Sequence, residues 1–473
     1  MAFTLGRFER ELRAILDGIP PPGSGDGLAA VCVALSGGLD STVLLSALAQ
    51  LRAGQPDAWP ALRAIHIDHA LHPDSSQWSL RAAELAGSLQ VPLQSLRVDA
   101  AAARGESPEA AARNARLAAF RACLRPGEVL ATAHHADDQV ETILLQWLRG
   151  GGLAAVGGMA PLAPFEPHGW HVRPLLAFRR AELEAWARAQ GLQWSEDPSN
   201  GDRRFDRNYL RHEVLPAVQA RWPGAAQTIG RVAGFARDAL ATEAAAALGD
   251  LQTLLCGVTL DLELLSRLPA PRRRAALRAW LDGLGLPRPP SRTLEALERD
   301  MALAAVDRVP ETRWPGAIVR RYRGRLHADP PGTGRSREGV WSDPDRTAYA
   351  WTADARLELV PDVGAGLRRD SLPRALQVAT RTGGEMLLPA GAAHHRPLRK
   401  WLQEHGVLPW RRAELPLLRD ERGRLVAVAD LACGAQFAAQ PGEPSWRIVW
   451  HGRGAVTQPD ALRFSWPRHP PIR

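Results

Sequence analysis

The chain has 473 residues, of which 45% are hydrophobic and 23% charged, which allows two or three globular domains with cores of their own. Its four cysteines are widely scattered and no apolar run reaches membrane-spanning length, which excludes a disulfide-stapled secreted domain and a membrane span. The net charge of +8 favours a polyanionic partner. We therefore expect a soluble cytoplasmic protein.

Strand and helix patterns alternate through the first half of the chain. After an amphipathic helix at 4–18, strands are expected at 30–35, 62–68, 92–98, 128–133 and 170–172. Helices are expected after them, at 42–48, 76–89, 108–124, 137–149 and 179–190. This alternation predicts an α/β fold with a doubly wound parallel sheet, whose ligands bind at the carboxyl ends of the strands.

The composition changes twice after this part of the chain. From about residue 225 the pattern is helical and rich in Ala and Leu, and short β-like runs follow a segment rich in Pro, Gly and Ser. We expect a small α+β domain at the C-terminal end. The predicted parts are a catalytic domain at 1–222, a helical domain at 223–328, a linker and irregular segment at 329–372, the α+β domain at 373–450 and a tail at 451–473.

A glycine turn after the first buried strand is the most informative short motif. The string Ser36-Gly37-Gly38-Leu39-Asp40-Ser41 leads from the strand into a helix, where backbone N–H groups at the positive helix end can bind phosphate. The hydroxyls of Ser36 and Ser41 add donors, and Asp40 is a candidate Mg²⁺ ligand beside a triphosphate. A plain serine cap before a tight turn is the alternative.

Two further segments, the end of a strand and the face of a helix, carry polar groups. His66, His69 and His72 share a spacing of three residues, which leaves a zinc site open, although a loop beside a nucleotide is favoured. Arg113 and Arg116 share one face of the helix that starts after Ser107. They are either a solvated basic stripe or a pair that binds phosphate or carboxylate.

The densest polar stretch runs from Ala131 to Thr142 and opens a helix. Asp138 and Glu141 lie three residues apart on one face, which suits an ammonium group or Mg²⁺, although aspartates also cap helices. His134 or His135 could move a proton near neutral pH. The glycines between Arg149 and Met159 predict a flexible loop.

An arginine-rich segment follows the loop Glu196-Asp197-Pro198-Ser199-Asn200. Its basic residues include Arg207 and Arg211, and their number around a loop points to backbone phosphates, with a solvated helix start as the alternative.

These motifs together resemble the tRNA(Ile)-lysidine synthetase family of PP-loop ATP pyrophosphatases. The strings SGGLDS, HIDHALHPDS, SPEAAARNAR, TAHHADDQVETILLQWLRGGG and SEDPSN…RNYLRHEVLP occur in that family's order, as do TGGE, RPLRKWL and PWRR near the C-terminal end. Ala70 and His72 stand where the family more often has Gly and Arg, which affects the expected contacts of that loop alone.

The resemblance implies a two-step reaction on a tRNA(Ile) that carries the CAU anticodon. ATP adenylates the oxygen on carbon 2 of the wobble cytidine, and free L-lysine then displaces AMP to leave lysidine. ATP and Mg²⁺ are the implied cofactors, no membrane takes part, and a homodimer is left open.

The implied roles fall on residues already described. Ser36 to Ser41 would bind pyrophosphate, Asp40 the metal, and Asp138 and Glu141 the lysine amine. Arg113 and Arg116 would bind the triphosphate or the lysine carboxylate, and His134 would be a candidate base, which the sequence does not rank above His135. The implied tRNA-binding residues are basic: Arg207, Arg211, Arg272, Arg273, Arg274, Arg396, Lys400, Arg411 and Arg412.

Other functions stay open at this stage. A thiolating PP-loop enzyme usually has paired cysteines, and a PP-loop synthetase acting on small molecules would leave the basic C-terminal domain unexplained. A binding module without catalysis would not need the aspartates of the two central motifs.

Overall fold

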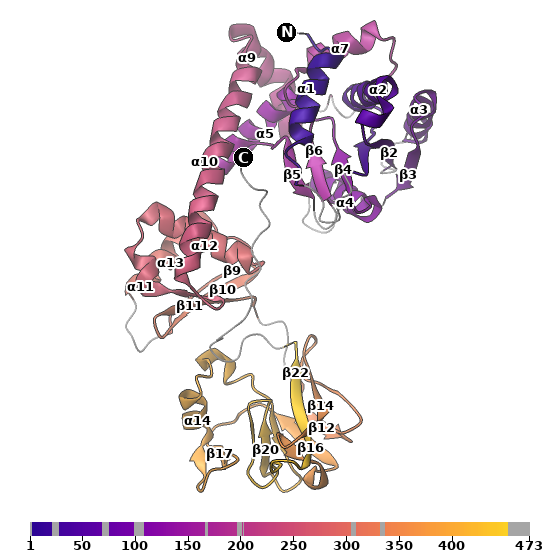
Figure 1. Cartoon of the computed structure of the whole chain (residues 1–473). Helices are drawn as coiled ribbons and strands as arrows, with labels where there is room; N and C mark the ends of the chain where they lie inside the picture. Colours follow the sequence, from indigo (N-terminus) through magenta and orange to yellow (C-terminus); the bar gives the residue numbers. More distant parts are fainter. Residues whose placement is uncertain are drawn as a thin grey trace. The chain divides into compact units, whose positions relative to one another are not determined.

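The computed structural model divides the chain into two compact units between residues 243 and 244 (Figure 1). The structure describes residues 2–20, 28–68, 75–98, 108–165, 169–195, 201, 203–303, 309–331 and 336–452.

The first unit is built on a six-stranded sheet in the order β3-β2-β1-β4-β6-β5. Its strands are β1 (Ala30–Ala34), β2 (Ala61–Asp68), β3 (Leu93–Arg97), β4 (Glu128–Ala131), β5 (Leu162–Phe165) and β6 (Gly169–Val172). The first four in chain order and β6 run parallel, with β1 between β2 and β4. The parallel α/β prediction is confirmed, and β5 is an unpredicted antiparallel edge strand.

Helices cover both faces of this sheet, as in a doubly wound fold. The helices up to residue 221 are α1 (Leu5–Leu16), α2 (Leu39–Gly54), α3 (Ser75–Ser88), α4 (Pro108–Cys123), α5 (Ala136–Leu148), α6 (Gly152–Gly157), α7 (Arg180–Ala189), α8 (Asp206–Tyr209) and α9 (Leu215–Arg221), and α10 (Ala225–Leu254) runs across the division between the two units. Val31 and Val33 of β1 belong to the same apolar core as buried residues of α1, α2, α3 and α7. Cys32, between them, packs in a second core with Phe120 of α4. The alternation of side chains along β1 explains why its continuous apolar run serves two cores.

The segment after α5 is helical, so the prediction of a flexible loop there was wrong. Residues Gly152–Gly157 form α6, and Met159 is tied to α5 through Gln139. The Gln139 amide donates to the Met159 carbonyl at 2.9 Å and its Oε1 accepts from the Met159 N–H at 2.7 Å. Glycine is needed at 158 because φ is +57° and the helix is close.

The second unit contains two hydrophobic cores. The first joins α11 (Leu262–Arg267), α12 (Ala270–Gly283) and α13 (Ser291–Leu303) to an antiparallel sheet in the order β7-β8-β11-β10-β9. Those strands are β7 (Leu255–Cys256), β8 (Thr259–Asp261), β9 (Glu311–Trp314), β10 (Ala317–Tyr322) and β11 (Arg325–Asp329). The predicted helices are present, but the sheet was not expected.

The second core holds the C-terminal antiparallel sheets together. Its strands are β12 (Gly339–Ser342), β13 (Tyr349–Ala350), β14 (Arg356–Val363), β15 (Leu367–Arg368), β16 (Ala375–Ala379), β17 (Met386–Leu387), β18 (Arg396–Pro397), β19 (Leu417–Arg419), β20 (Leu425–Val428), β21 (Ala432–Cys433) and β22 (Pro444–His451), with the short helix α14 (Leu398–Glu404).

The expected linker at 329–372 therefore needs correction. β14 pairs with β22 along its whole length, from Arg356 opposite His451 to Val363 opposite Pro444, and β12 pairs with β16. Buried Trp341 and Trp351 anchor this segment in the core. The prolines and glycines of this segment lie in turns between short strands. Composition alone cannot distinguish such turns from a linker, because both are rich in these residues. Most of the tail at 451–473 lies outside the described residues.

Across the described ranges, no helix is both long enough and apolar enough to cross a membrane.

Replacement of Gly158 by alanine is expected to disturb the helix that carries the central polar residues. A Cβ there would lie 2.8 Å from Gln139 Oε1 and 2.9 Å from Ile143 Cγ1 of α5, at a φ that disfavours side chains. We expect Gly158→Ala to lower the free energy of unfolding by about 2 kcal/mol in urea titrations. Gly152→Ala is the matched control, because a Cβ at Gly152 has no atom within 4 Å. Equal stability of the two variants would contradict this account.

Candidate nucleotide and amine site

The glycine turn joins β1 to α2 at the carboxyl edge of the sheet. Gly37 has a φ of +84°, and Gly38 precedes α2 without a side-chain cap, so the first N–H groups of α2 are left to a ligand. Ser41 Oγ donates to the Gly38 carbonyl at 3.0 Å and accepts from the Ser36 N–H at 3.2 Å. These bonds fold the turn around its own backbone, as a phosphate cradle requires.

Asp40, in the first turn of α2, lacks full compensation for its charge. Its Oδ1 is buried and has no hydrogen-bond partner, and the basic groups beside Oδ2 are His135, with Nε2 at 3.7 Å, and Arg180, with Nη1 at 3.8 Å. Burial raises the pKa of Asp40, and the nearby His135 and Arg180 oppose that rise. A carboxylate oxygen so placed favours a bound cation.

His135 and Asp138 begin α5 with a reciprocal cap. The His135 ring Nδ1 accepts from the Asp138 N–H at 3.3 Å, and Asp138 Oδ2 accepts from the His135 N–H at 3.0 Å. Capping is thus one role of Asp138, as the simpler interpretation of the sequence held. Its second oxygen serves another purpose.

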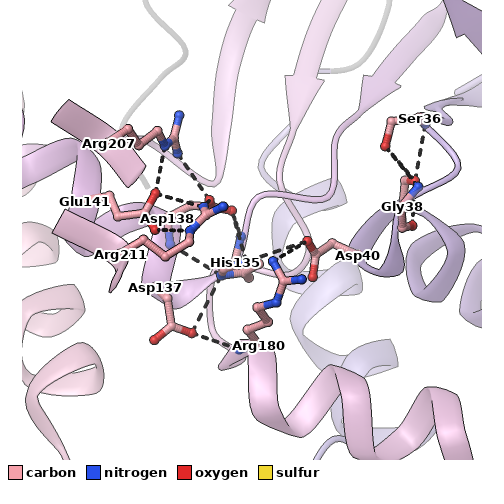
Figure 2. A network of polar contacts seen from close by, with 11 residues as sticks. Ser36, Gly38, Asp40, His135, Asp137, Asp138, Glu141, Arg180, Arg207 and Arg211 are labelled. Carbon is pink, nitrogen blue, oxygen red and sulfur yellow. Dashed lines mark hydrogen bonds and ion pairs between the residues drawn. The ribbon is translucent and has the colours of Figure 1, made fainter. Parts of the chain in front are cut away.

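Asp138 and Glu141 bind two arginines from the segment after β6 (Figure 2). Arg207 Nε donates to Glu141 Oε2 at 2.7 Å and its Nη2 to Asp138 Oδ1 at 3.2 Å. Arg211 Nε donates to Glu141 Oε1 at 2.7 Å and its Nη2 to Asp138 Oδ1 at 3.1 Å. The Glu141 side chain is fully buried. Arg211 pairs with it bidentately, because its Nη2 also donates to Glu141 Oε2 at 3.0 Å, whereas Arg207 bridges Glu141 and Asp138.

The electrostatics of Asp138 follow from this arrangement. Burial raises its pKa, but His135 and Arg207 outweigh burial and hold the pKa at about 2. A lowered folded-state pKa means that the group stabilises the fold above its unfolded value near 4, and that this contribution is lost as pH falls toward 2. At neutral pH, two carboxylates face two guanidinium groups, and the cluster carries no net charge.

Arg207 and Arg211 were predicted to contact tRNA phosphates, and the structure gives them carboxylate partners within the first unit instead. They lie on one face because α8 runs into a π-helical turn at Leu210–Val214. Their tRNA role remains a prediction. The spacing of the two arginines does not by itself predict this pairing. The prediction would also require knowing that their segment contacts the start of α5.

The remaining predicted residues of this site also gather near the cluster. Desolvation lowers the pKa of Arg116, and repulsion from Arg113 and Arg207 adds to it, so three guanidinium groups lie close enough to interact. Burial lowers the pKa of His134 to about 4, against the opposing charge of Asp138. The structure therefore brings α4, the start of α5 and α8 together.

Several participants were missed by the sequence analysis. Asp137 Oδ2 accepts from the Arg180 N–H and its Oδ1 from Gln219 Nε2, both at 2.8 Å, which ties α5 to α7 and α9. Ser195 donates its backbone N–H to the Gly37 carbonyl at 2.9 Å. Thr132 hydrogen-bonds both His134 and His171. Thr132 and Asp137 belong to the motif at the start of α5, but that motif alone did not reveal these contacts, and Ser195 and His171 belong to no recognisable short motif.

The zinc alternative loses one of its three histidines. His66 is buried, with Nδ1 2.8 Å from the Leu35 carbonyl and Nε2 3.0 Å from Ser79 Oγ, so both ring nitrogens are used in the core. His69 and His72 lie outside the described residues, as do Ser107 and the loop 196–200.

The basic residues predicted in the second unit differ in their availability. Arg272 pairs with Asp250, Arg273 and Arg274 pair with Glu298, and Arg396 pairs with Glu404. Arg411 is held between Asp329 and Glu414, and Arg412 Nε donates to the Val407 carbonyl. Lys400 is exposed on α14. Lys400 is thus the candidate with its charge most open to a ligand, and the roles of all seven stay predictions.

Comparison with known proteins decides the family. A PP-loop domain model matches residues 6–218, a TilS substrate binding domain model matches 260–327, and a TilS substrate C-terminal domain model matches 376–450. A tRNA(Ile)-lysidine synthase from Methylococcus capsulatus is 38% identical over 88% of this chain and 95% of its own length. This chain belongs to the tRNA(Ile)-lysidine synthase family.

Other relatives extend the agreement along nearly the whole chain. Lysidine synthases from Alkalilimnicola ehrlichii and Xanthomonas campestris are each 41% identical over 89% of this chain, covering 94% and 95% of their own lengths. Membership in the lysidine synthase family, with its PP-loop domain, makes this protein an ATP-dependent ligase.

The residues present fit a metal held jointly with a nucleotide. Among the described residues, no group of three or more His, Cys, Asp or Glu side chains is arranged to hold a metal ion. Mg²⁺ at nucleotide sites usually has one or two carboxylates plus phosphate oxygens and water, and the orphaned Oδ1 of Asp40 beside the glycine turn meets that need.

Replacement of Asp40 by asparagine is expected to stabilise this lysidine synthase family member in the absence of ligands. Because burial raises the pKa of Asp40, its ionised form opposes folding at neutral pH. We expect Asp40→Asn to raise the free energy of unfolding at pH 7 by on the order of 1 kcal/mol, measured with urea. The gain should shrink as pH falls, because the wild-type carboxyl then becomes protonated in the folded state.

Asp137→Asn is the matched control. That carboxylate accepts two hydrogen bonds and should lose stability on substitution. Equal destabilisation by both substitutions would show that Asp40 is compensated after all.

Proposed function

We propose that this protein forms lysidine on a tRNA(Ile) bearing the CAU anticodon, in two steps that use ATP and then free L-lysine. In the first step, the oxygen on carbon 2 of the wobble cytidine bonds to the α-phosphorus of ATP, and pyrophosphate leaves. In the second, the amine nitrogen of lysine bonds to carbon 2, the carbon–oxygen bond breaks, and AMP leaves with the electron pair while the amine loses a proton to water.

One observation carries the proposal most directly. The phosphate-cradling turn at residues 36–41 and the carboxylates of Asp138 and Glu141 are linked through His135, whose Nε2 lies 3.7 Å from Asp40 Oδ2 and 3.4 Å from Asp138 Oδ2. A nucleotide site and an amine site thus share one wall. An enzyme that joins an amine to an adenylated base needs both within reach of one carbon atom.

Mg²⁺ is proposed at Asp40. When bound, it would neutralise charge on the phosphates and hold the pyrophosphate group for departure. The chain's own contribution is the turn that orients those phosphates and the arginines Arg113 and Arg116 that balance their charge.

The amine site is proposed at Asp138 and Glu141. Since Arg207 and Arg211 neutralise these carboxylates in the structure, an incoming lysine ammonium would share or replace a guanidinium partner. That exchange would make lysine binding dependent on movement of the segment that contains α8. It would also place the lysine carboxylate near the displaced arginine.

Contacts with tRNA are proposed for the basic residues named above, with Lys400 and Arg396 on the C-terminal domain as the exposed set. Their charge attracts phosphate in any sequence, so base selection must come from other contacts. The cytoplasm is the compartment proposed for this reaction, and the four cysteines, all free thiols, agree with a reducing environment.

A labelling assay tests the function. With ATP, Mg²⁺ and radiolabelled L-lysine, the protein should transfer label to tRNA(Ile) bearing CAU and release AMP and pyrophosphate in equal amounts. A tRNA(Met) with the same anticodon is the control and should remain unlabelled. Absence of label on tRNA(Ile), with a preparation that binds ATP, would refute the proposal.

Substitutions at the two carboxylates should affect different steps. Asp40→Asn should abolish pyrophosphate release, because the first step needs the charge at the phosphates. Asp138→Asn should raise the KM for lysine at least tenfold, since a charge-assisted hydrogen bond of about 1.5–3 kcal/mol is lost, with a smaller effect on the KM for ATP. Equal loss of both steps in both variants would contradict this division.

A further inference from the structure

A chain of four polar side chains runs from β6 to the start of α5. Arg173 Nη2 lies 2.9 Å from His171 Nδ1, His171 Nε2 lies 2.7 Å from Thr132 Oγ1, and Thr132 Oγ1 lies 2.8 Å from His134 Nδ1. Arg173 is anchored at its far end, where Nη1 donates to the Ala160 carbonyl. β6 and β4 are neighbours in the sheet, which brings these residues together.

Donor chemistry assigns every proton in this chain. A guanidinium group only donates, so His171 Nδ1 accepts and its proton lies on Nε2. That N–H donates to Thr132 Oγ1, and the threonine hydroxyl then donates to His134 Nδ1. The opposite choice at His134 would leave the hydroxyl proton without an acceptor among the described residues. His134 therefore carries its proton on Nε2, away from Thr132.

The surrounding charges keep both rings neutral. His134 faces Asp138 from α5, Arg207 from α8, Arg116 from α4 and Arg173 after β6, and burial with the three arginines outweighs the one carboxylate. The pKa of His134 falls to about 4, and burial and Arg173 lower the pKa of His171 to about 2. Neither ring is charged at neutral pH.

His135 is anchored at the same ring nitrogen by a different group. Its Nδ1 accepts from the Asp138 backbone, so its proton also lies on Nε2, toward the Asp40 and Asp138 carboxylates. In both histidines Nδ1 is occupied by a hydrogen bond, and the other ring nitrogen, Nε2, carries the N–H. Neither ring therefore presents a free lone pair that could accept a proton.

We propose that His134 acts in this reaction as a neutral hydrogen-bond donor through Nε2–H, and not as a general base, with Thr132, His171 and Arg173 as its positioning residues. This inference rests on the proposed function. The acceptor is an oxygen of the reacting pair, either the carbonyl on carbon 2 of the cytidine or an oxygen of the α-phosphate. The proton that the lysine amine loses passes to water.

Nitrogen-15 NMR of histidine-labelled protein tests the assignment without reference to activity. At pH 7, long-range proton–nitrogen correlations should show His134 and His171 with the proton on Nε2, and neither pattern should change between pH 5.5 and 8. Signals are assigned by their loss in His134→Gln and His171→Gln. A proton on Nδ1 of His134, or titration near pH 6.5, would overturn the proposal.

Activity measurements test the positioning chain. Thr132→Val should lower kcat by about 10- to 100-fold with little change in the KM for ATP, and Thr132→Ser, which keeps the hydroxyl, should recover most of that loss. His134→Gln retains an N–H donor and should exceed His134→Leu in kcat by about tenfold or more. Equal kcat for these two variants would refute a donor role.

The pH profile separates donor from base. With His134 as a donor, the rate of the lysine step should rise steadily with pH as the lysine amine loses its proton, without an inflection near pH 6.5. An inflection there that disappears in His134→Gln would establish a base.

Pyrophosphate release assayed without lysine shows which step uses the His134 donor. A slower release in His134→Leu places the oxygen acceptor in the first step, and an unchanged release places it in the second step alone. Absence of lysidine formation by the wild-type protein would sink the proposed function, while the NMR result would still report on the histidines.

Discussion

The pairing of two buried carboxylates with two arginines is the interaction on which the site depends. Glu141 has no exposed surface and Asp138 very little, and an isolated carboxylate at such depth would be protonated or would destabilise the fold. Arg207 and Arg211 prevent this from a separate segment, since Arg211 binds both oxygens of Glu141 and Arg207 bridges Glu141 and Asp138. Removing one partner from a buried pair of this kind typically costs about 3–5 kcal/mol, so the cluster also holds the α8 segment against α5.

The parallel sheet explains why the nucleotide turn and this cluster are neighbours. β1 and β4 lie side by side, and the turn at 36–41 and the residues 134–138 follow their carboxyl ends. Residues nearly 100 positions apart in sequence thereby share one edge. His135 occupies the junction, with its ring buried between Asp40 and Asp138. Burial raises the pKa of Asp40, and the charge of Asp138 raises it further.

The sequence was sufficient for the fold class and for the motifs of the first unit, because both depend on local patterns. A buried apolar run before SGGLDS predicts a central strand, and the alternation that follows predicts the parallel sheet. Between Gly339 and Arg368, the sequence predicted a β-like run only at 357–360, which lies inside β14. The other strands there escaped prediction because they are short and owe their order to pairing with partners distant in the chain, as β15 does with β22. The same reason hid the roles of Arg207 and Arg211, whose carboxylate partners are about 70 positions earlier in the chain.

The histidines show how geometry can reverse an expectation that is sound for the residue type. His134 and His135 were natural candidates for bases because the ordinary pKa of imidazole is near 6.5. Anchoring of Nδ1 in each ring by a hydroxyl or a backbone N–H removes the lone pair on that side, and burial among arginines removes the charged form of His134. A general base is also less necessary when the nucleophile is an amine, because a free amine already has its lone pair. What the proposed reaction demands instead is stabilisation of charge that develops on oxygen, and fixed N–H donors in a partly buried site would supply it without reorganisation.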